Sequence, residues 1–194
     1  MKFISDYFTY VSNVCSQMPE ESIKKLIFKL NSLRKVNGRL FILGVGGSAG
    51  NASHAVNDFR KLCNIEAYAP TDNVSELTAR TNDEGFETIF SEYIKTSRGC
   101  NKDAILIFSV GGGNIKKNVS INLINAVKEA RNRKMEVYSI VGMAEGYAAK
   151  NSDISVVIPV INQKLVTPIS EAFQAVIWHC IVSHPDLAVN STKW

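Results

Sequence analysis

Apolar residues recur at helical spacing through the first 37 residues of the chain. The residues that share a helical face are Phe3, Tyr7 and Val11 in a first group and Ile23, Leu26, Ile27 and Leu30 in a second. The sequence Met-Pro-Glu-Glu-Ser at 18–22 separates the two groups, and Asn37-Gly38 ends the pattern. We therefore expect a helical N-terminal segment over residues 1–37, which packs on the core or on a neighbouring subunit.

Beyond residue 38, short apolar runs alternate with amphipathic stretches. They predict strands at 40–43, 65–68, 104–108, 137–141 and 154–158, and helices at 48–62, 115–132 and 168–182. Thr167 is expected to cap the last helix, with Pro168 at its first position. Apolar strands that alternate with helices are typical of parallel βαβ units. We expect an α/β fold, a doubly wound five-stranded parallel sheet sandwiched between helices, with ligands bound beyond the carboxyl ends of the strands.

The composition narrows the class of protein. The chain has 194 residues, 45% of them hydrophobic and 21% charged, which favours one compact domain over residues 1–194. A net charge of +4 with scattered basic residues excludes a nucleic-acid partner by composition. There is no run of 18 apolar residues and no export signal, so we expect a cytoplasmic protein without membrane contact. The four cysteines form no Cys-x-x-Cys motif and are expected to be reduced and mostly buried.

Two glycine-rich loops follow predicted strands. The first reads Gly-Val-Gly-Gly-Ser-Ala-Gly at 44–50, and the second reads Phe-Ser-Val-Gly-Gly-Gly-Asn at 108–114. Glycine lets the backbone approach an anion, and the N-terminus of the following helix adds partial positive charge. Two tight strand-to-helix turns would also explain the glycines. The serine in each loop, Ser48 and Ser109, favours a phosphate site over simple turns.

Two of the three histidines stand at helical spacing from an acid. His54 and Asp58 are four residues apart, and Glu171 and His179 are eight apart, so each pair can share a helix face. The four residues could hold a divalent metal ion or act as general acid and base. Singly, each is more often a surface or core side chain. Their pairing, and the position of one pair directly after a phosphate-type loop, favours a functional site.

The first loop also fits a dinucleotide-binding fingerprint. Gly44-x-Gly46-x-x-Ala49 matches G-x-G-x-x-G/A, and Glu66 lies 22 residues past Gly44, near the end of the second predicted strand. A ribose-binding acid would lie there. This alternative predicts a nicotinamide-dependent oxidoreductase and leaves the second loop unexplained.

Residues 43–59, LGVGGSAGNASHAVNDF, resemble the G-N-G-G-S-A-x-D-A-x-H-x-x-x-E-L segment of the sedoheptulose 7-phosphate isomerases, or phosphoheptose isomerases. These belong to the sugar isomerase (SIS) domain class. Residues 78–86, TARTNDEGF, are similar to the L-T-A-x-x-N-D-x-G-F segment of the same family. The resemblance runs from the N-terminal helices to His179 and implies the SIS type of parallel sheet sandwich.

The resemblance also implies roles for individual residues. The proposed contacts to substrate and phosphate are Gly46, Gly47, Ser48, Asp83, Ser109, Val110, Gly111 and Asn114. His54 matches a metal-binding histidine, Asp58 occupies the position of the catalytic glutamate, and His179 matches the catalytic histidine. Known members are tetramers whose active sites combine residues from neighbouring subunits, and some bind zinc.

Several positions depart from the family pattern. Asp58 stands in place of glutamate and is one methylene shorter, and Glu171 stands in place of glutamine. Val45 replaces the asparagine of the first loop. Two serines of the second loop are replaced by Gly111 and Asn114. These changes indicate a divergent subgroup, in which Glu171 could take over a base role and strengthen metal binding.

We expect an aldose–ketose isomerase that converts sedoheptulose 7-phosphate to D-glycero-D-manno-heptose 7-phosphate through an enediol. Asp58 and His179 form the expected acid–base pair, with Glu171 as substitute base. A divalent metal ion, zinc by the resemblance, is expected on His54, Asp58, Glu171 and His179. The expected partners are a sugar phosphate and the other subunits of a homotetramer. Two alternatives stay open: a non-catalytic SIS module that binds a sugar phosphate, and the nicotinamide-dependent oxidoreductase.

Overall fold

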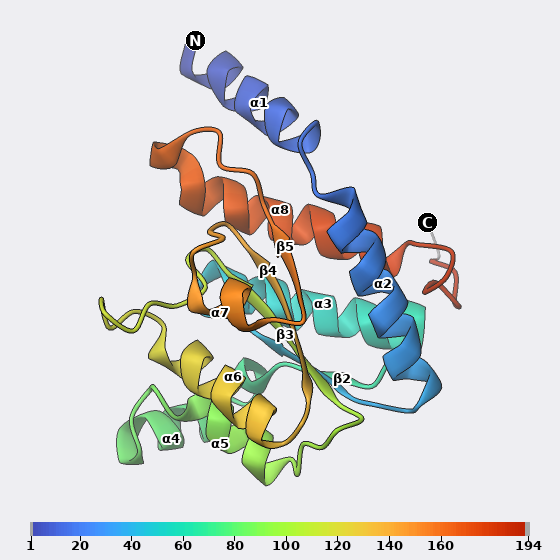
Figure 1. Ribbon diagram of the computed structural model, residues 1–194, viewed down its shortest axis with the longest axis vertical. Coiled ribbons are helices and arrows are strands. Elements are labelled where there is room, and N and C mark those ends of the chain that lie inside the picture. The colour runs from blue at the N-terminus through green and yellow to red at the C-terminus, as the bar shows by residue number, and fades with distance from the viewer. Residues whose placement is uncertain (1, 193–194) are drawn as a thin grey trace.

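The computed structural model describes residues 2–192 and contains a five-stranded parallel sheet in the order β2-β1-β3-β4-β5 (Figure 1). The strands are β1 (Leu40–Leu43), β2 (Ala67–Tyr68), β3 (Ala104–Ser109), β4 (Glu136–Val141) and β5 (Ile154–Val157). The predicted doubly wound sheet is confirmed. The chain leaves β1 toward β2 on one side and places β3 on the other. Ligands bind in open α/β sheets at such a reversal of strand order.

Helices cover both faces of the sheet (Figure 1). On one face lie α2 (Glu20–Lys35), α3 (Gly47–Cys63) and α8 (Val166–Val182), and on the other lie α5 (Ile89–Thr96), α6 (Ile121–Asn132) and α7 (Tyr147–Asn151). Successive strand residues point to opposite faces. In β1, Leu40 and Ile42 therefore join the first apolar cluster, and Phe41 and Leu43 join the second.

The helix predicted over 115–132 begins only at Ile121. Residues 114–119 form a turn in which the backbone groups of Asn114 and Val119 pair in both directions. Ile115 and Val119 have helical spacing, but they are 58% and 51% exposed. A helix there would have no core beneath its apolar stripe, and most helical stability comes from such packing.

Other differences concern the ends of elements. The last helix begins at Val166, after a 3-10 turn at Gln163–Leu165, so Thr167 lies inside its first turn and does not cap it. Pro168 fits there because first-turn N–H groups have no helical acceptor. The strand predicted at 65–68 keeps only its last two residues. The short helices α4 (Val74–Asp83), α5 and α7 were not predicted, since none has a long apolar period.

The segment Gln163–Val182 is long and apolar enough, at 20 residues, for a membrane span. Phe173 and Trp178 are among the eight buried residues of α8, however, and they pack in the cluster between the helices and the sheet. Core packing therefore accounts for the apolar character of this helix.

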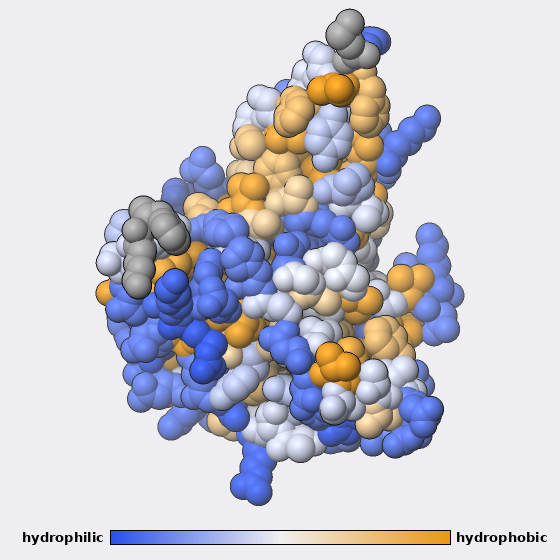
Figure 2. Space-filling model, turned by 180° about the vertical axis from the view of Figure 1, so that it is seen from behind, coloured by the Kyte–Doolittle hydropathy of each residue, from blue (hydrophilic) through white to orange (hydrophobic). Residues whose placement is uncertain are grey.

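The first helix, α1 (Lys2–Cys15), projects away from the sheet and its covering helices (Figure 1). Val14 is its one buried residue, whereas Phe3, Ile4 and Phe8 are 67%, 62% and 65% exposed. Figure 2 shows the resulting apolar surface on the projecting helix. The two helices predicted in residues 1–37 are confirmed. α2 packs on the core, but α1 leaves a large apolar surface uncovered.

The cysteines are more exposed than the sequence led us to expect. Cys63 is buried, whereas Cys15, Cys100 and Cys180 are exposed, and all four are free thiols. Burial raises the pKa of the Cys63 thiol to about 11. Cys63 is therefore a structural residue with little thiolate at neutral pH.

Two glycines around the first loop predict opposite effects of alanine on stability. A Cβ on Gly44 would lie 2.3 Å from the backbone oxygen of Ser48, which cannot move without breaking the turn into α3. Gly50 lies inside α3 with open space around it. We expect Gly44→Ala to lower the free energy of unfolding by about 1–3 kcal/mol. Gly50→Ala should raise it by about 0.5–1 kcal/mol through helix propensity. Urea unfolding of both variants checks this, and equal shifts would contradict the tight turn.

Candidate active site

The helices α3 and α8 lie side by side and run in the same direction. Four pairs of residues mark their contact, in chain order: Gly47 with Glu171, Asn51 with Gln174, His54 with Trp178, and Asp58 with His179. Asn51 secures the amino ends, because its Nδ2 donates to the Glu171 carbonyl oxygen (2.9 Å) and to Gln174 Oε1 (3.0 Å). Because the helices are parallel, the first turn of α3 lies beside the first turns of α8, and later turns pair in the same order.

Asp58 lies between two imidazoles. Its Oδ2 is 3.9 Å from Nε2 of His54 and 3.9 Å from Nε2 of His179. One potential ligand atom from each residue lies within 4.8 Å of the other two. The Asp58 side chain is only 14% exposed, whereas those of His54 and His179 are 59% and 50% exposed. A sheltered carboxylate beside two accessible imidazoles suits proton transfer or the binding of a cation.

His54, Asp58 and His179 are called the trio below, and hydrogen bonds orient two of its members. Nδ1 of His179 lies 2.8 Å from the carbonyl oxygen of Ala175. A carbonyl oxygen only accepts, so Nδ1 carries the proton and the neutral ring keeps its lone pair on Nε2, the atom nearest Asp58. Asn57 donates to Oδ1 of Asp58 at 2.8 Å. His179 is therefore preset to accept a proton or bind a metal ion through Nε2.

Glu171 lies apart from the trio. A Cβ on Gly47 would be 2.5 Å from Oε2 of Glu171, so this carboxylate lies against the start of α3. Eight residues along a helix span about 12 Å, and parallel packing brings Glu171 level with Gly47 rather than with Asp58. Of the four metal ligands expected from the sequence, the structure brings together three, His54, Asp58 and His179, and Glu171 lies apart. At its observed place the Glu171 carboxylate complements the partial positive charge of the α3 N-terminus.

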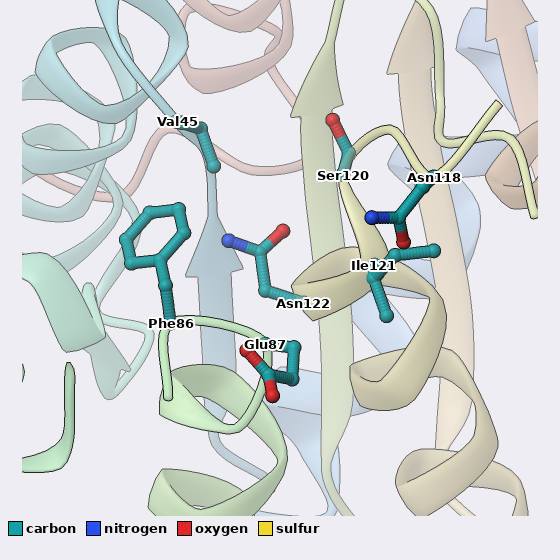
Figure 3. A pocket seen from close by; sticks show the side chains of 7 residues that line it. All are labelled: Val45, Phe86, Glu87, Asn118, Ser120, Ile121 and Asn122. Atoms are coloured by element: carbon teal, nitrogen blue, oxygen red, sulfur yellow. The ribbon is translucent and has the colours of Figure 1, made fainter. Parts of the chain in front are cut away.

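A cavity of about 520 Å³ opens at the reversal of strand order, between the first loop and the start of α6 (Figure 3). Its lining residues are Val45, Phe86, Glu87, Asn118, Ser120, Ile121 and Asn122. In Figure 3 the Asn122 amide points toward Val45 and Phe86 across the cavity. The cavity therefore combines an aromatic wall with several polar groups, as sites for polar small molecules do.

The amino end of α6 is suited to bind an anion. Asn122 is 2% exposed, its Oδ1 accepts from the Leu123 N–H at 2.8 Å, and its Nδ2 has no partner among the described residues. Ser120 holds the position before the helix with φ +51°, and its hydroxyl does not cap the helix. An unpaired buried donor and an uncapped helix start together provide hydrogen bonds and positive potential for a phosphate.

None of the phosphate contacts predicted from the resemblance is among the residues that line this cavity. Ser48 and Ser109 are buried, and the Ser109 hydroxyl accepts from the Gly112 N–H at 3.0 Å, so it shapes the second loop. Gly46 and Gly47 are exposed, and Val110 and Gly111 are half-buried. Asn114 is exposed and its Oδ1 accepts from the Lys117 N–H. Asp83 is exposed at the end of α4 and accepts from Asn82.

The sequence profile of the SIS domain matches residues 6–142. The chain belongs to the SIS domain family. The matched part contains β1 to β4, both glycine-rich loops and two members of the trio, His54 and Asp58. His179 lies beyond it, on α8.

Relatives of this SIS chain include named enzymes. A phosphoheptose isomerase of Buchnera aphidicola subsp. Schizaphis graminum is 32% identical over 143 residues, 72% of this chain and 70% of the relative. The lincomycin biosynthesis protein LmbN of Streptomyces lincolnensis is 31% identical over 155 residues, 76% of this chain but only 56% of that protein. The fold is similar to that of phosphoheptose isomerase GmhA from Neisseria gonorrhoeae, with a TM-score of 0.80 at 23% identity, covering 93% of this chain and 96% of the other.

Glu66 lies at the amino end of β2, the wrong end of the strand for a dinucleotide site. Glu66 precedes β2, and its carbonyl oxygen accepts from the N–H of Leu40, the first residue of β1. Gly44 follows the other, carboxyl end of β1, where a ribose-binding acid would have to lie. The Glu66 carboxylate instead accepts from the Tyr68 hydroxyl at 2.8 Å. The oxidoreductase alternative therefore loses the acid on which it rested.

Ser120, Asn122, Glu87 and Asn118 line the cavity but were missed by the sequence reasoning. The signal for two of them was present. Ser-Ile-Asn at 120–122 stands directly before an apolar periodic stretch, which is typical of a helix start. Ile115 and Val119 have helical spacing by chance, so the predicted helix began at residue 115 and ran through this start signal.

Proposed function

We propose that the protein is a sugar-phosphate isomerase that interconverts sedoheptulose 7-phosphate and D-glycero-D-manno-heptose 7-phosphate. The observation that carries the proposal is the position of Asp58 between the Nε2 atoms of His54 and His179. The SIS family match and the relatives named phosphoheptose isomerase support the substrate class.

The phosphate group would bind at the amino end of α6. The free Nδ2 of Asn122 and the Ser120 hydroxyl supply donors, and the helix N-terminus supplies positive potential. We assign supporting contacts to the two loops and to the end of α4, namely Gly46, Gly47, Ser48, Asp83, Ser109, Val110, Gly111 and Asn114. The sugar chain would then run from this anchor toward the trio on α3 and α8.

The reaction moves one proton between adjacent carbons. A base removes the proton from the carbon next to the carbonyl, the freed electron pair forms the double bond of an enediol, and the carbonyl oxygen takes up a proton. Return of a proton to the former carbonyl carbon, with loss of the proton from the other hydroxyl, gives the isomer. We assign these transfers to Asp58 and His179, whose facing atoms are 3.9 Å apart. Glu171 is the substitute base for a substrate that lies nearer the start of α3.

The trio also fits a divalent metal ion. Two imidazole nitrogens and a carboxylate oxygen within 4.8 Å of one another form the ligand set of many zinc sites, and the Ala175 carbonyl fixes the tautomer that His179 needs. We propose that His54, Asp58 and His179 can hold such an ion, zinc by its ligand preference, with Glu171 outside the set. A ligand atom bound to the ion cannot transfer a proton at the same moment, so ion binding and the acid–base role of Asp58 and His179 are alternative states of the site. Bound there, a zinc ion would supply Lewis acidity for the sugar carbonyl.

We further propose a homotetramer whose subunits complete each other's active sites. Phe3, Ile4 and Phe8 leave α1 with an apolar surface that a neighbouring copy could cover (Figure 2). His54 and His179 are at least half exposed, and proton transfer to carbon benefits from the exclusion of water.

In this proposal residues 1–194 act as one SIS domain in the cytoplasm. Residues 1, 193 and 194 lie outside the described part of the chain.

A substrate assay tests the proposal. Incubation of the protein with sedoheptulose 7-phosphate, with and without added Zn²⁺, should produce the heptose phosphate signals by NMR. Saturation binding of the sugar phosphate without turnover in either condition would instead favour a non-catalytic SIS module. Failure to bind the sugar phosphate would overturn both functions.

A further inference from the structure

Trp178 contacts both histidines of the trio. Its ring centroid lies 3.5 Å from that of His179 in a stacked arrangement, and 4.7 Å from that of His54 in an edge-on arrangement. The two imidazoles are themselves edge-on to each other, with centroids 5.4 Å apart. Because Trp178 is fully buried and the imidazoles are half exposed, the indole forms the floor on which both rings rest.

Packing alone does not explain a tryptophan at this position. The indole Nε1 is buried and has no hydrogen-bond partner among the described residues. Such an orphaned donor is costly, and phenylalanine would fill an apolar site without it. What the two-ring indole adds is a flat surface wide enough for two imidazoles at once.

We propose that Trp178 is a positioning residue, whose indole holds the imidazoles of His54 and His179 so that both Nε2 atoms face Asp58. His54 comes from α3 and has no hydrogen bond among the described residues to fix its ring, so its orientation rests on the indole and on the carboxylate 3.9 Å away. His179 is held by the Ala175 carbonyl on one edge and by the indole on its face. Loss of the indole should therefore increase the rotational freedom of the His54 ring more than that of the His179 ring.

This inference deepens the proposed function, because the rings that Trp178 holds are the proposed acid–base and metal-binding groups. It is tested on the free protein without substrate, so its outcome is separate from that of the isomerase assay. The variants are Trp178→Leu and Trp178→Phe. Phe173→Leu is the matched control, since Phe173 is a buried aromatic residue of the same helix with no ring contact to either histidine.

Two measurements follow the rings. Histidine ring NMR is tractable because the chain has only three histidines, and His184→Asn identifies the signal that belongs outside the trio. In the wild type we expect cross-relaxation between the ring protons of His54 and His179, which Trp178→Leu should abolish and Phe173→Leu should keep. Titration with Co²⁺ should show a loss of affinity of about tenfold to hundredfold in Trp178→Leu, with a smaller loss in Trp178→Phe.

The stability of the variants separates positioning from packing. Phe173→Leu should unfold at lower urea and retain wild-type Co²⁺ affinity. Trp178→Phe should combine weaker Co²⁺ binding with a smaller loss of stability than Trp178→Leu, since both remove the orphaned N–H but phenylalanine keeps more of the buried aromatic packing. Unchanged cross-relaxation in Trp178→Leu overturns the proposal, whether or not the wild type binds Co²⁺. An equal loss of Co²⁺ affinity in Phe173→Leu also overturns it, because the effect would then be one of general packing.

Discussion

Asp58→Asn is expected to lower kcat/KM for the isomerisation by about 10²-fold or more. The amide has the size of the carboxylate, so the contact between α3 and α8 should persist. It cannot take up a proton in the required range, however, and it carries no charge to balance a protonated imidazole 3.9 Å away on either side. The measurement is the steady-state rate with sedoheptulose 7-phosphate, together with a urea unfolding curve that shows the fold unchanged.

The chain offers a matched control for this substitution. Asp186 lies 3.8 Å from Nδ1 of His184, in a second histidine–aspartate pair that is outside the candidate site. Asp186→Asn removes the same charge next to the same kind of ring and should leave kcat/KM within about twofold of the wild type, as surface substitutions usually have small effects. A near-normal rate for Asp58→Asn would remove Asp58 from the acid–base pair.

Asn122→Asp should raise KM for the sugar phosphate by about 10–100-fold and change kcat less. The side chain is 2% exposed and its Nδ2 is a free donor at the cavity, so the substitution replaces a donor by a carboxylate where the phosphate is proposed to bind. Two like charges about 4 Å apart repel by about 4 kcal/mol at an effective dielectric constant of 20, and repositioning of the phosphate would reduce that cost.

Asn132→Asp is the corresponding control, because it adds the same charge to the exposed last residue of the same helix. It should lower stability slightly, since a negative charge at a helix C-terminus is unfavourable, and leave KM unchanged. Inorganic phosphate offers a second measurement, as it should compete with substrate in the wild type and in Asn132→Asp but much less in Asn122→Asp. Equal KM values for the two variants would place the phosphate elsewhere.

The sheet was predictable because its signal is local. The run Ala104–Phe108 is covered on both faces, so it is apolar throughout, and the charged Asp103 precedes it. The start of α6 was not predictable in the same way. Ile115 and Val119 have helical spacing, and only the tertiary structure shows that nothing packs beneath them. Because the start of α6 after Ser120 was not predicted, the polar residues at that end of the cavity, Ser120 and Asn122, were not predicted either.

The trio shows the same division between local and tertiary information. The spacing of His54 and Asp58 placed both on one face of α3, and the apolar helix around His179 was evident from its sequence. The alignment of α8 against α3 was not, because it depends on contacts such as that of Asn51 with Gln174. That alignment decides that His179 meets Asp58 while Glu171 lies two turns away, beside Gly47.

The parallel contact between α3 and α8 also determines when, during synthesis of the chain, the proposed acid–base pair can form. Asp58 and His179 are separated by 121 residues (179 − 58), and the intervening chain builds most of the sheet. A ribosome-bound chain that has made β1 to β5 therefore still lacks one imidazole of the trio and a helix that covers one face of its sheet. Emergence of the last helix thus completes the core and the proposed proton-transfer pair in one step.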